Sequence, residues 1–340
     1  MRKNLRPPQA VRAVRFLLVL ICLVALVATG ACTAARPNID DAPDGQNALP
    51  TRQIVIGTMI TEDILPMWIA ESEDLFAAAG LDASVQTFQS AQELSTALAS
   101  GAVEMAMTDI MVSATLCASG TPVRIEWITL GADREQGRFG IMANPESGYT
   151  TLKELAGVPI GVGSCTVPEY VMDKLMEEAG VPQEQIVGEE IKKVPVRYEM
   201  MVAGQVAAAA LPGSLLALGE ATGMVLVADD RGSANLSQSV MIAREPFADS
   251  SEGAAALAAL ARIWDEAANG VNANPEAYRA LLVEKAQLPK PVWDSYPIST
   301  YPLAQMPSAQ MIDPVLDWML EKGYLKQPLT YDAATGVFQL

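Results

Sequence analysis

The sequence predicts an α/β fold built as two similar lobes with a ligand cleft between them. From residue 52 onward, short β-type runs alternate with segments of helical apolar spacing, which is the pattern of successive β-α units. The same order of elements starts again at residue 158. Two further strand-like runs, 138–143 and 238–243, indicate that the chain crosses between the lobes twice. Clefts between lobes are where small ligands bind.

The first series of elements has clear start and stop signals. Strands are expected at 53–57, 83–88 and 103–107, and helices at 65–79 and 91–100. Ser90 and Glu93 have the spacing of a capping box that opens the second helix. Gly80 and Gly101 follow the two helices where a C-terminal glycine stop is favoured.

The second series repeats this plan and sets the lobe boundaries. Strands are expected at 158–162 and 191–194, and helices at 167–179 and 197–203. Residues 51–144 together with 237–340 are assigned to lobe one, and residues 145–236 to lobe two. Amphipathic helices at 250–268, 275–285 and 311–322 are expected to pack on lobe one.

Composition excludes several classes of function. The 340 residues include 40 Asp+Glu, 23 Lys+Arg, four cysteines and no histidine, for a net charge of −17. An acidic surface repels nucleic-acid phosphates, so we expect no nucleic-acid binding. Without imidazole there is no Ser-His-Asp, Cys-His or His-zinc arrangement, so we expect no metal site, no cofactor and no catalytic residue. Cys117 is expected to be a buried apolar residue, whereas Cys165 follows a strand and could face the cleft.

The amino terminus has the pattern of a targeting segment. Five basic residues and no acid occur in residues 1–15, and an apolar run follows at 16–31. This run is shorter than the ~20 residues of a spanning helix. Thr29-Gly30-Ala31-Cys32 resembles a bacterial lipoprotein box, with Thr29 where Leu is usual. We therefore expect a lipoprotein signal peptide at 1–31, lipidation of Cys32 and a flexible tether at 32–50, the alternative being an uncleaved anchor.

Several segments resemble the NMT1/THI5-like substrate-binding proteins of ABC importers, which serve nitrate, sulfonates such as taurine, and thiamine pyrimidine precursors. The segments are QIVIGTMITEDILPMWIAESEDLFAAAGL, FQSAQELSTALASGAVEMAMTDI and TLKELAGVPIGVGSCTVPEYVMDKLMEEAG. The resemblance implies a type II periplasmic-binding-protein-like fold. One departure is Ala207, where an acidic residue is usual after Gly-x-Val, while Glu104 holds the counterpart in lobe one.

In such a fold, the loops at the carboxyl ends of the strands line the cleft, and helix N-termini there can hold polar groups. The candidate ligand contacts are Thr58, Thr61, Glu62, Trp68, Ser90, Gln92, Asp109, Ser164, Cys165, Thr166, Tyr170, Arg197 and Tyr198. Trp68 is expected either to stack on a planar ring or to belong to the core. Glu62 and Asp63 would favour an amino-bearing ligand, whereas Arg197 would hold an anion. The alternatives are that Glu62 and Asp63 are solvated surface acids and that Arg197 forms a surface salt bridge.

The resemblance implies a binding protein and not an enzyme. We expect capture of a small polar organic solute by hinge closure, with a heteroaromatic of the thiamine-pyrimidine-precursor type preferred because of Trp68, Glu62 and Asp63. The alternatives are a sulfonate such as taurine, nitrate, or a ligand-sensing role. Pyrimidine synthases of this fold use histidine and a cysteine-rich motif, which this sequence lacks. The expected partners are a permease and its ATPase, for a monomer held outside the cytoplasm on the cell membrane.

Overall fold

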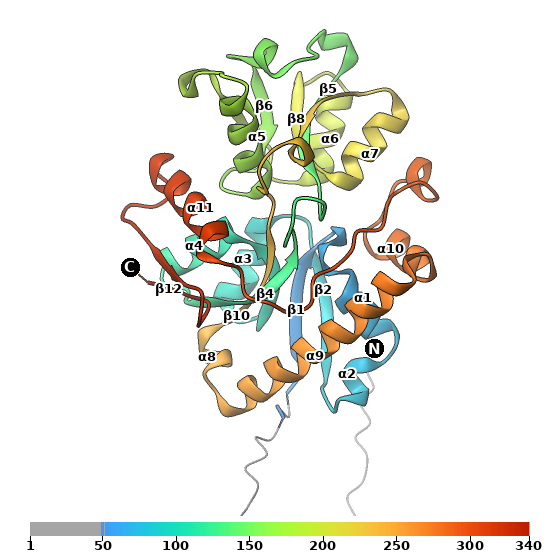
Figure 1. Cartoon of the computed structure of the whole chain (residues 1–340), viewed down its shortest axis with the longest axis vertical. Coiled ribbons are helices and arrows are strands. Elements are labelled where there is room, and N and C mark those ends of the chain that lie inside the picture. Colours follow the sequence, from blue (N-terminus) through green and yellow to red (C-terminus); the bar gives the residue numbers. More distant parts are fainter. Residues whose placement is uncertain (1–48, 51, 340) are drawn as a thin grey trace, which may run out of the picture. The chain divides into compact units, whose positions relative to one another are not determined.

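The computed structural model describes residues 49–50 and 52–339. Two sheets organise this part of the chain (Figure 1). The first has the order β11-β12-β4-β10-β3-β1-β2, and the second has the order β7-β6-β8-β5-β9. We call the first sheet with its helices lobe one and the second sheet with its helices lobe two. The expected signal peptide, the lipidation site Cys32 and the tether up to residue 48 lie outside the described residues.

Lobe one is a mixed sheet with helices on both faces. Its strands are β1 (Ile54–Met59), β2 (Ala83–Phe88), β3 (Met105–Asp109), β4 (Val123–Leu130), β10 (Ser239–Arg244), β11 (Thr330–Asp332) and β12 (Val337–Gln339). Its helices are α1 (Leu65–Ser72), α2 (Leu75–Ala78), α3 (Ala91–Ser100), α4 (Ile110–Ala118), α8 (Glu245–Ala248), α9 (Ser251–Ala273), α10 (Arg279–Lys285) and α11 (Ala309–Glu321). β1 pairs in parallel with β2 and β3, whereas β10 is antiparallel to β3 and β4.

Lobe two has five strands and three α-helices. The strands are β5 (Phe139–Ala143), β6 (Pro159–Val162), β7 (Val187–Glu190), β8 (Ala208–Pro212) and β9 (Val225–Asp229). The helices are α5 (Val167–Glu178), α6 (Val194–Val202) and α7 (Gly213–Thr222). The chain enters this lobe after β4 and leaves it before β10. The two crossings therefore lie in the segments 131–138 and 230–238.

Three expected elements differ from the observed ones. The strand near 138–143, assigned to lobe one, is β5 and pairs with β8 and β9 in lobe two. The helix expected at 65–79 is divided into α1 and α2 because Asp74 has a left-handed backbone with φ of 57°. The strand expected at 191–194 occurs four residues earlier as β7, an edge strand that is largely exposed and therefore lacks apolar alternation.

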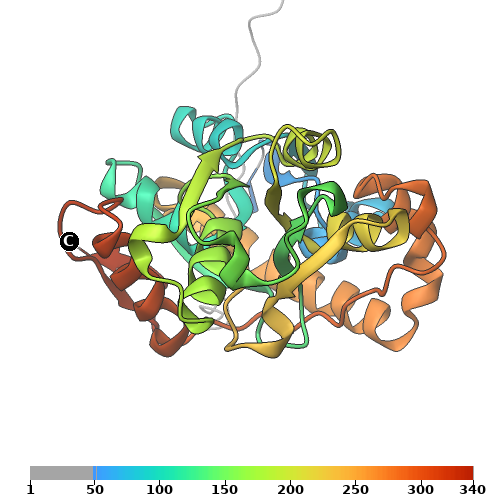
Figure 2. The same cartoon turned by 90° about the horizontal axis from the view of Figure 1, so that it is seen from above.

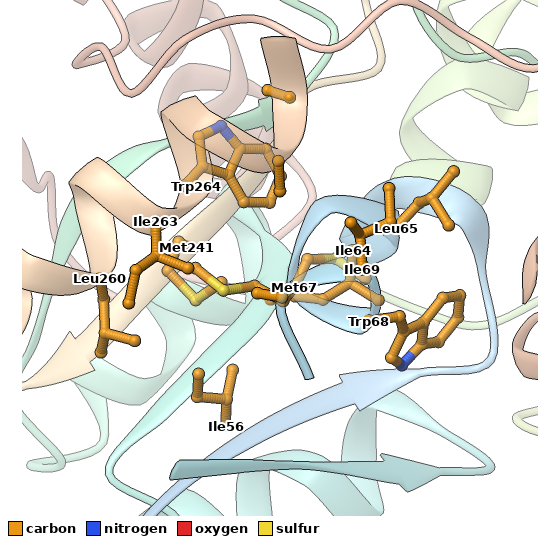
Figure 3. Close-up of a cluster of buried hydrophobic side chains, with 14 of the residues drawn as sticks. Ile56, Ile64, Leu65, Met67, Trp68, Ile69, Met241, Leu260, Ile263 and Trp264 are labelled. Atoms are coloured by element: carbon orange, nitrogen blue, oxygen red, sulfur yellow. The ribbon is translucent and has the colours of Figure 1, made fainter. Parts of the chain in front are cut away.

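The core of lobe one holds α9 against the sheet and α1. Met67, Trp68 and Ile69 of α1 pack with Leu260, Ile263 and Trp264 of α9 and with Ile56 and Met241 of the sheet (Figure 3). All of these side chains are almost completely buried. Their burial fixes the start of α1, and with it the loop 60–64 that precedes it.

Helix α11 contacts both lobes, although it was expected on lobe one alone. It packs against α4, and its Trp318 also stacks edge-on against Tyr170 of α5 at 5.2 Å. Trp318 Nε1 donates a hydrogen bond to Asp173 of α5 at 2.8 Å. Viewed from lobe two, α11 and α10 lie on opposite sides of the described body (Figure 2). The C-terminal segment therefore ties α5 of lobe two to lobe one.

Candidate functional site

A small cavity lies where the two lobes meet, at the carboxyl ends of β1 and β3 in lobe one and of β6 in lobe two. Its volume is about 50 Å³, which is enough for a few water-sized groups. The lining residues are Met59, Thr61, Asp63, Ala91, Met107, Thr108, Asp109, Phe139, Gly163, Thr166, Val167, Pro168, Lys192, Val194, Arg197, Pro212 and Ser239. We call this space the central cavity.

Asp109 links the two lobes at the central cavity. It is the N-cap of α4, and its Oδ1 accepts a hydrogen bond from the Val112 amide at 2.8 Å. Its Oδ2 accepts from the amide of Val167, the first residue of α5 in lobe two, at 3.2 Å. Two helix N-termini thus share one carboxylate, which their partial positive charge stabilises. Burial nevertheless raises the pKa of Asp109 to about 6.

Arg197 is a buried cation with no acidic partner. Its side chain is 1% exposed, and among the described residues no carboxylate oxygen lies within 4.0 Å of its guanidinium. Nε donates to the Ile191 carbonyl at 3.0 Å and Nη1 to the Ala210 carbonyl at 2.8 Å. Burial lowers its pKa to about 10, against the opposing charge of Glu190. A charge buried in this way is costly unless an anion pairs with it.

The absence of a side chain at Gly163 leaves space for the Arg197 guanidinium. A Cβ built on Gly163 would lie 2.7 Å from Nη2 and 3.5 Å from the Thr166 hydroxyl oxygen. Any larger residue at 163 would therefore push the guanidinium away from the position it holds. Both Gly163 and Arg197 line the central cavity, so this close approach places the free edge of the cation at the cavity wall.

Two acidic residues of lobe one lie in or beside the central cavity. Asp63 is 5% exposed and lines the central cavity, and its Oδ1 accepts a hydrogen bond from the Ser239 hydroxyl at 2.5 Å. The neighbouring Glu62 is not in the lining; its Oε1 accepts from the Tyr296 hydroxyl. Burial and the charge of Asp63 raise the pKa of Glu62 to about 7. The cavity lining therefore holds two carboxylates from lobe one, Asp63 and Asp109, and two cations from lobe two, Lys192 and Arg197.

Two threonine hydroxyls complete the polar lining. Thr61 and Thr108 are almost fully buried, and their Oγ1 atoms have no hydrogen-bond partner among the described residues. Unpaired buried hydroxyls are costly. Both residues line the central cavity, where a bound solute can supply the missing partners.

The structure divides the sequence-predicted contacts into three groups. Thr61, Asp109, Thr166 and Arg197 line the central cavity. Ser90, Gln92, Ser164 and Cys165, together with Thr166, line a neighbouring cavity of about 520 Å³, and Tyr198 lines a third space of about 310 Å³. Thr58, Glu62, Trp68 and Tyr170 line none of the three.

The four residues of the last group have other partners. Trp68 is enclosed in the lobe-one core shown in Figure 3, and Tyr170 packs on Trp318. Thr58 donates to the Met59 carbonyl at 2.9 Å, and Glu62 is bound by Tyr296. The aromatic stacking considered for Trp68 therefore has no support in this arrangement.

Other lining residues were not among the predicted contacts. Ser239 starts β10 and Phe139 starts β5, and each reaches the cavity because the adjoining crossing segment runs between the lobes. Lys192 lies between β7 and α6, and its Nζ donates across the lobes to Gln92 at 2.6 Å. No local sequence pattern marks these positions, and the first crossing was expected after the strand 138–143, whereas it lies before β5.

Residues 61–277 match the sequence profile of the NMT1/THI5 like family. The match covers both lobes and most of the described chain. The chain belongs to the NMT1/THI5-like family. No curated protein sequence matches it. The expected family and the two-lobed α/β fold are thereby confirmed.

Solved structures share the fold at low sequence identity. The alkanesulfonate-binding protein SsuA from Xanthomonas axonopodis pv. citri, bound to MOPS, is 18% identical, with a TM-score of 0.70, covering 82% of this chain and 96% of SsuA. The nitrate-binding protein NrtA from Synechocystis is 14% identical, with a TM-score of 0.67, covering 81% and 82%. The desulfurization enzyme DSZB is 15% identical, with a TM-score of 0.59, covering 81% and 94%. Within residues 52–339, no helix is both long enough and apolar enough to cross a membrane.

Proposed function

We propose that this NMT1/THI5-like protein is the solute-binding component of an ABC importer and that its solute is a small organic zwitterion of the aminosulfonate type. The observation that carries the proposal is Arg197, a buried guanidinium without an acidic partner among the described residues at the wall of the central cavity. A guanidinium binds planar or tetrahedral oxyanions through paired N–H groups. The sulfonate would therefore lie against lobe two.

Asp63 supports an amine on the same solute. One of its oxygens accepts a hydrogen bond from Ser239, and the carboxylate lines the same cavity as Arg197. A bare anion such as nitrate would satisfy Arg197 but would face this carboxylate with no donor between them. A solute with both an anionic and an ammonium group meets both walls of the cavity. Binding to both lobes at once would favour the closed arrangement.

The heteroaromatic solute of the thiamine-pyrimidine-precursor type has weaker support. That expectation used Trp68 as a stacking platform and Glu62 with Asp63 as acceptors. Trp68 is in the core and Glu62 does not line the central cavity, so of these three residues only Asp63 can contact the solute there. The alternative expectation of a sulfonate, which used Arg197, is the one we carry forward.

A binding role fits the chemistry of the cleft better than catalysis does, although the fold is shared with a desulfurization enzyme. The cleft thiol is that of Cys165, in the neighbouring cavity of about 520 Å³. Burial raises the pKa of Cys165 to about 12, which keeps the thiol protonated and a poor nucleophile. We therefore propose capture and release of an unchanged solute. Attachment through lipid on Cys32, outside the cytoplasm, would hold the protein beside its permease and ATPase.

Thermal melting with a panel of solutes tests this proposal. The purified protein is melted with taurine, nitrate, a 4-aminopyrimidine and glucose, because a ligand of the folded state raises the melting temperature. We expect a shift with taurine in the wild-type protein and none in Arg197→Gln. A shift with the aminopyrimidine alone would overturn the aminosulfonate assignment. Loss of labelled taurine uptake on deletion of the gene would test the import role.

A further inference from the structure

Helix α5 of lobe two is packed against lobe one outside the central cavity. Its side chains Tyr170, Val171 and Leu175 lie in one apolar core with residues of α4, α11 and the sheet of lobe one. Each of the three side chains is at most 5% exposed, and none of them lines the central cavity. The two lobes therefore share a packed apolar interface that a solute in the central cavity does not contact.

Two buried carboxylates of α5 extend this interface. Asp173 is 2% exposed, and its Oδ2 accepts a hydrogen bond from Trp318 Nε1 at 2.8 Å and lies 2.8 Å from Lys322 Nζ. Glu169 is 4% exposed; its Oε2 accepts from the Tyr324 hydroxyl at 2.7 Å, and its Oε1 lies 3.3 Å from the same Nζ. The three partners lie in α11 or directly after it, and α11 packs on α4 of lobe one. We call these five residues the α5 clasp.

Movement of α5 away from α11 would be unfavourable in two ways. It would expose to water the buried rings of Tyr170 and Trp318, which pack edge-on at 5.2 Å. It would also remove Lys322, the only cation within 4.0 Å of either clasp carboxylate among the described residues. Loss of one partner of a buried ion pair is strongly destabilising. The clasp therefore opposes separation of the lobes at α5.

The contacts between the lobes near the starts of α3 and α6 are of a weaker kind. Lys193 Nζ of lobe two lies 3.8 Å from a carboxylate oxygen of Glu93, and Lys192 Nζ donates to Gln92 at 2.6 Å. All four side chains are exposed. Ion pairs and hydrogen bonds between exposed side chains contribute little to stability, because water competes for both partners. These contacts therefore hold the lobes less firmly than the buried clasp does.

From this difference we infer that the α5 clasp holds the two lobes together in the absence of solute. The solute-free protein then populates the closed arrangement, and a solute has little free energy of closure to supply. Trp318 and Lys322 control closure in this scheme, although neither of them lines the central cavity. The inference concerns the lobes alone, so it does not depend on which solute the protein binds.

The thiol of Cys165 reports whether the lobes separate. Its Sγ lies 3.5 Å from the Thr115 hydroxyl of α4, across the lobes, in the cavity of about 520 Å³. Burial raises the pKa of Cys165 to about 12, so the thiol reacts slowly with iodoacetamide, and exposure to water would speed the reaction. Cys117 is the internal reference, because its Sγ donates to the Val123 carbonyl within lobe one at 3.2 Å. Peptide mass spectrometry measures both rates in protein freed of solute by unfolding in urea, dialysis and refolding.

Two clasp variants and one matched control test the inference. Lys322→Met removes the cation of the clasp, and we expect it to raise the alkylation rate of Cys165 relative to Cys117 about tenfold or more. Trp318→Phe keeps a ring against Tyr170 and removes only the Nε1 donor, so we expect a rise of about threefold or more. Lys193→Met removes the exposed ion pair between the lobes and should leave the rate unchanged. X-ray scattering should show a larger radius of gyration for the clasp variants alone.

Three results would overturn the inference. The first is alkylation of Cys165 in the wild-type protein as fast as in the urea-unfolded protein, which would mean that the lobes are apart. The second is a wild-type rate and radius of gyration in both clasp variants. The third is a rise in Lys193→Met equal to that in Lys322→Met, which would assign the holding contact to the starts of α3 and α6. If Lys322→Met raises the Cys117 rate as well, it is unfolded, and Trp318→Phe decides the question.

Discussion

Replacement of Arg197 separates ligand binding from folding more sharply than any other change in the cleft. The guanidinium uses Nε and Nη1 for the Ile191 and Ala210 carbonyls, which leaves Nη2 without a partner among the described residues. Two charge-assisted hydrogen bonds to a sulfonate are worth about 3 kcal/mol at the low end. Since each 1.4 kcal/mol is a factor of ten, Arg197→Gln should weaken taurine binding about 100-fold or more.

The same substitution should change folding stability little. The fall in the pKa of Arg197 from 12.5 to about 10 corresponds to about 3 kcal/mol of unfavourable desolvation, which the variant removes. Against this gain, up to two buried carbonyls lose a donor, at about 1–3 kcal/mol each. The two effects are of opposite sign and similar size.

Isothermal titration and urea unfolding measure the two effects on one preparation. Arg124→Gln is the matched control, because Arg124 pairs with Glu126 and Asp249 and does not line the central cavity. We expect the control to bind taurine as the wild type does. If folded Arg197→Gln binds taurine within tenfold of the wild type, the assignment of Arg197 as the anion-binding residue is wrong.

Three further predictions concern the cavity, its acids and the contact between lobes. Gly163→Ala should weaken taurine binding at least tenfold without changing any charge, because its Cβ would lie 2.7 Å from Arg197 Nη2. Between pH 4.5 and 7, folded Glu62 keeps a proton that the unfolded chain releases, so Glu62 should lower stability as pH rises, by up to about 3 kcal/mol. Asp109, whose pKa is also raised, lowers stability over the same range, so Glu62→Gln should reduce the fall between pH 4 and pH 8 in urea titrations without abolishing it. Lys322→Met should cost about 3 kcal/mol of unfolding free energy, because Asp173 then keeps no cation at 2.8 Å.

Each of these predictions has a control in the chain. Gly232→Ala meets no atom within 4 Å and should leave binding unchanged. Exposed Glu321→Gln should leave the wild-type pH dependence in place, and exposed Lys326→Met should leave the unfolding free energy unaltered. Normal affinity in Gly163→Ala, an unchanged pH slope in Glu62→Gln, or a wild-type urea midpoint in Lys322→Met would each contradict the corresponding argument.

Much of the fold could be predicted because its signals are local. Ser90 caps the Glu93 amide at 3.2 Å, and Gly80 and Gly101 follow their helices with left-handed backbones, as the capping and stop patterns indicate. The strand β7 was not predicted at its observed position because its exposed sequence has no alternating apolar pattern. The left-handed turn at Asp74 was not predicted because no glycine occupies this position.

The candidate site depends on contacts between residues far apart in the sequence. The sequence allowed two interpretations of Trp68 and of Arg197, ligand binding or a structural role. No signal in the sequence distinguishes between these two roles. Packing against α9 places Trp68 in the core, and Arg197 lines the central cavity without a carboxylate oxygen within 4.0 Å among the described residues. Burial and pairing are properties of the tertiary structure, so they could not be predicted from spacing.

The sequence by itself determined the family, the two-lobed α/β fold and those strands and helices that carry apolar periodicity, caps or stop residues, because these signals act over a few neighbouring positions. Tertiary structure decided which sheet receives β5, which lobe α11 joins, and which polar side chains meet. Asp109 and Val167 are 58 residues apart, and Ser239 and Asp63 are 176 apart. Such pairs form only when the lobes fold and meet, since hydrogen bonding and desolvation depend on distance in space and not on position along the chain.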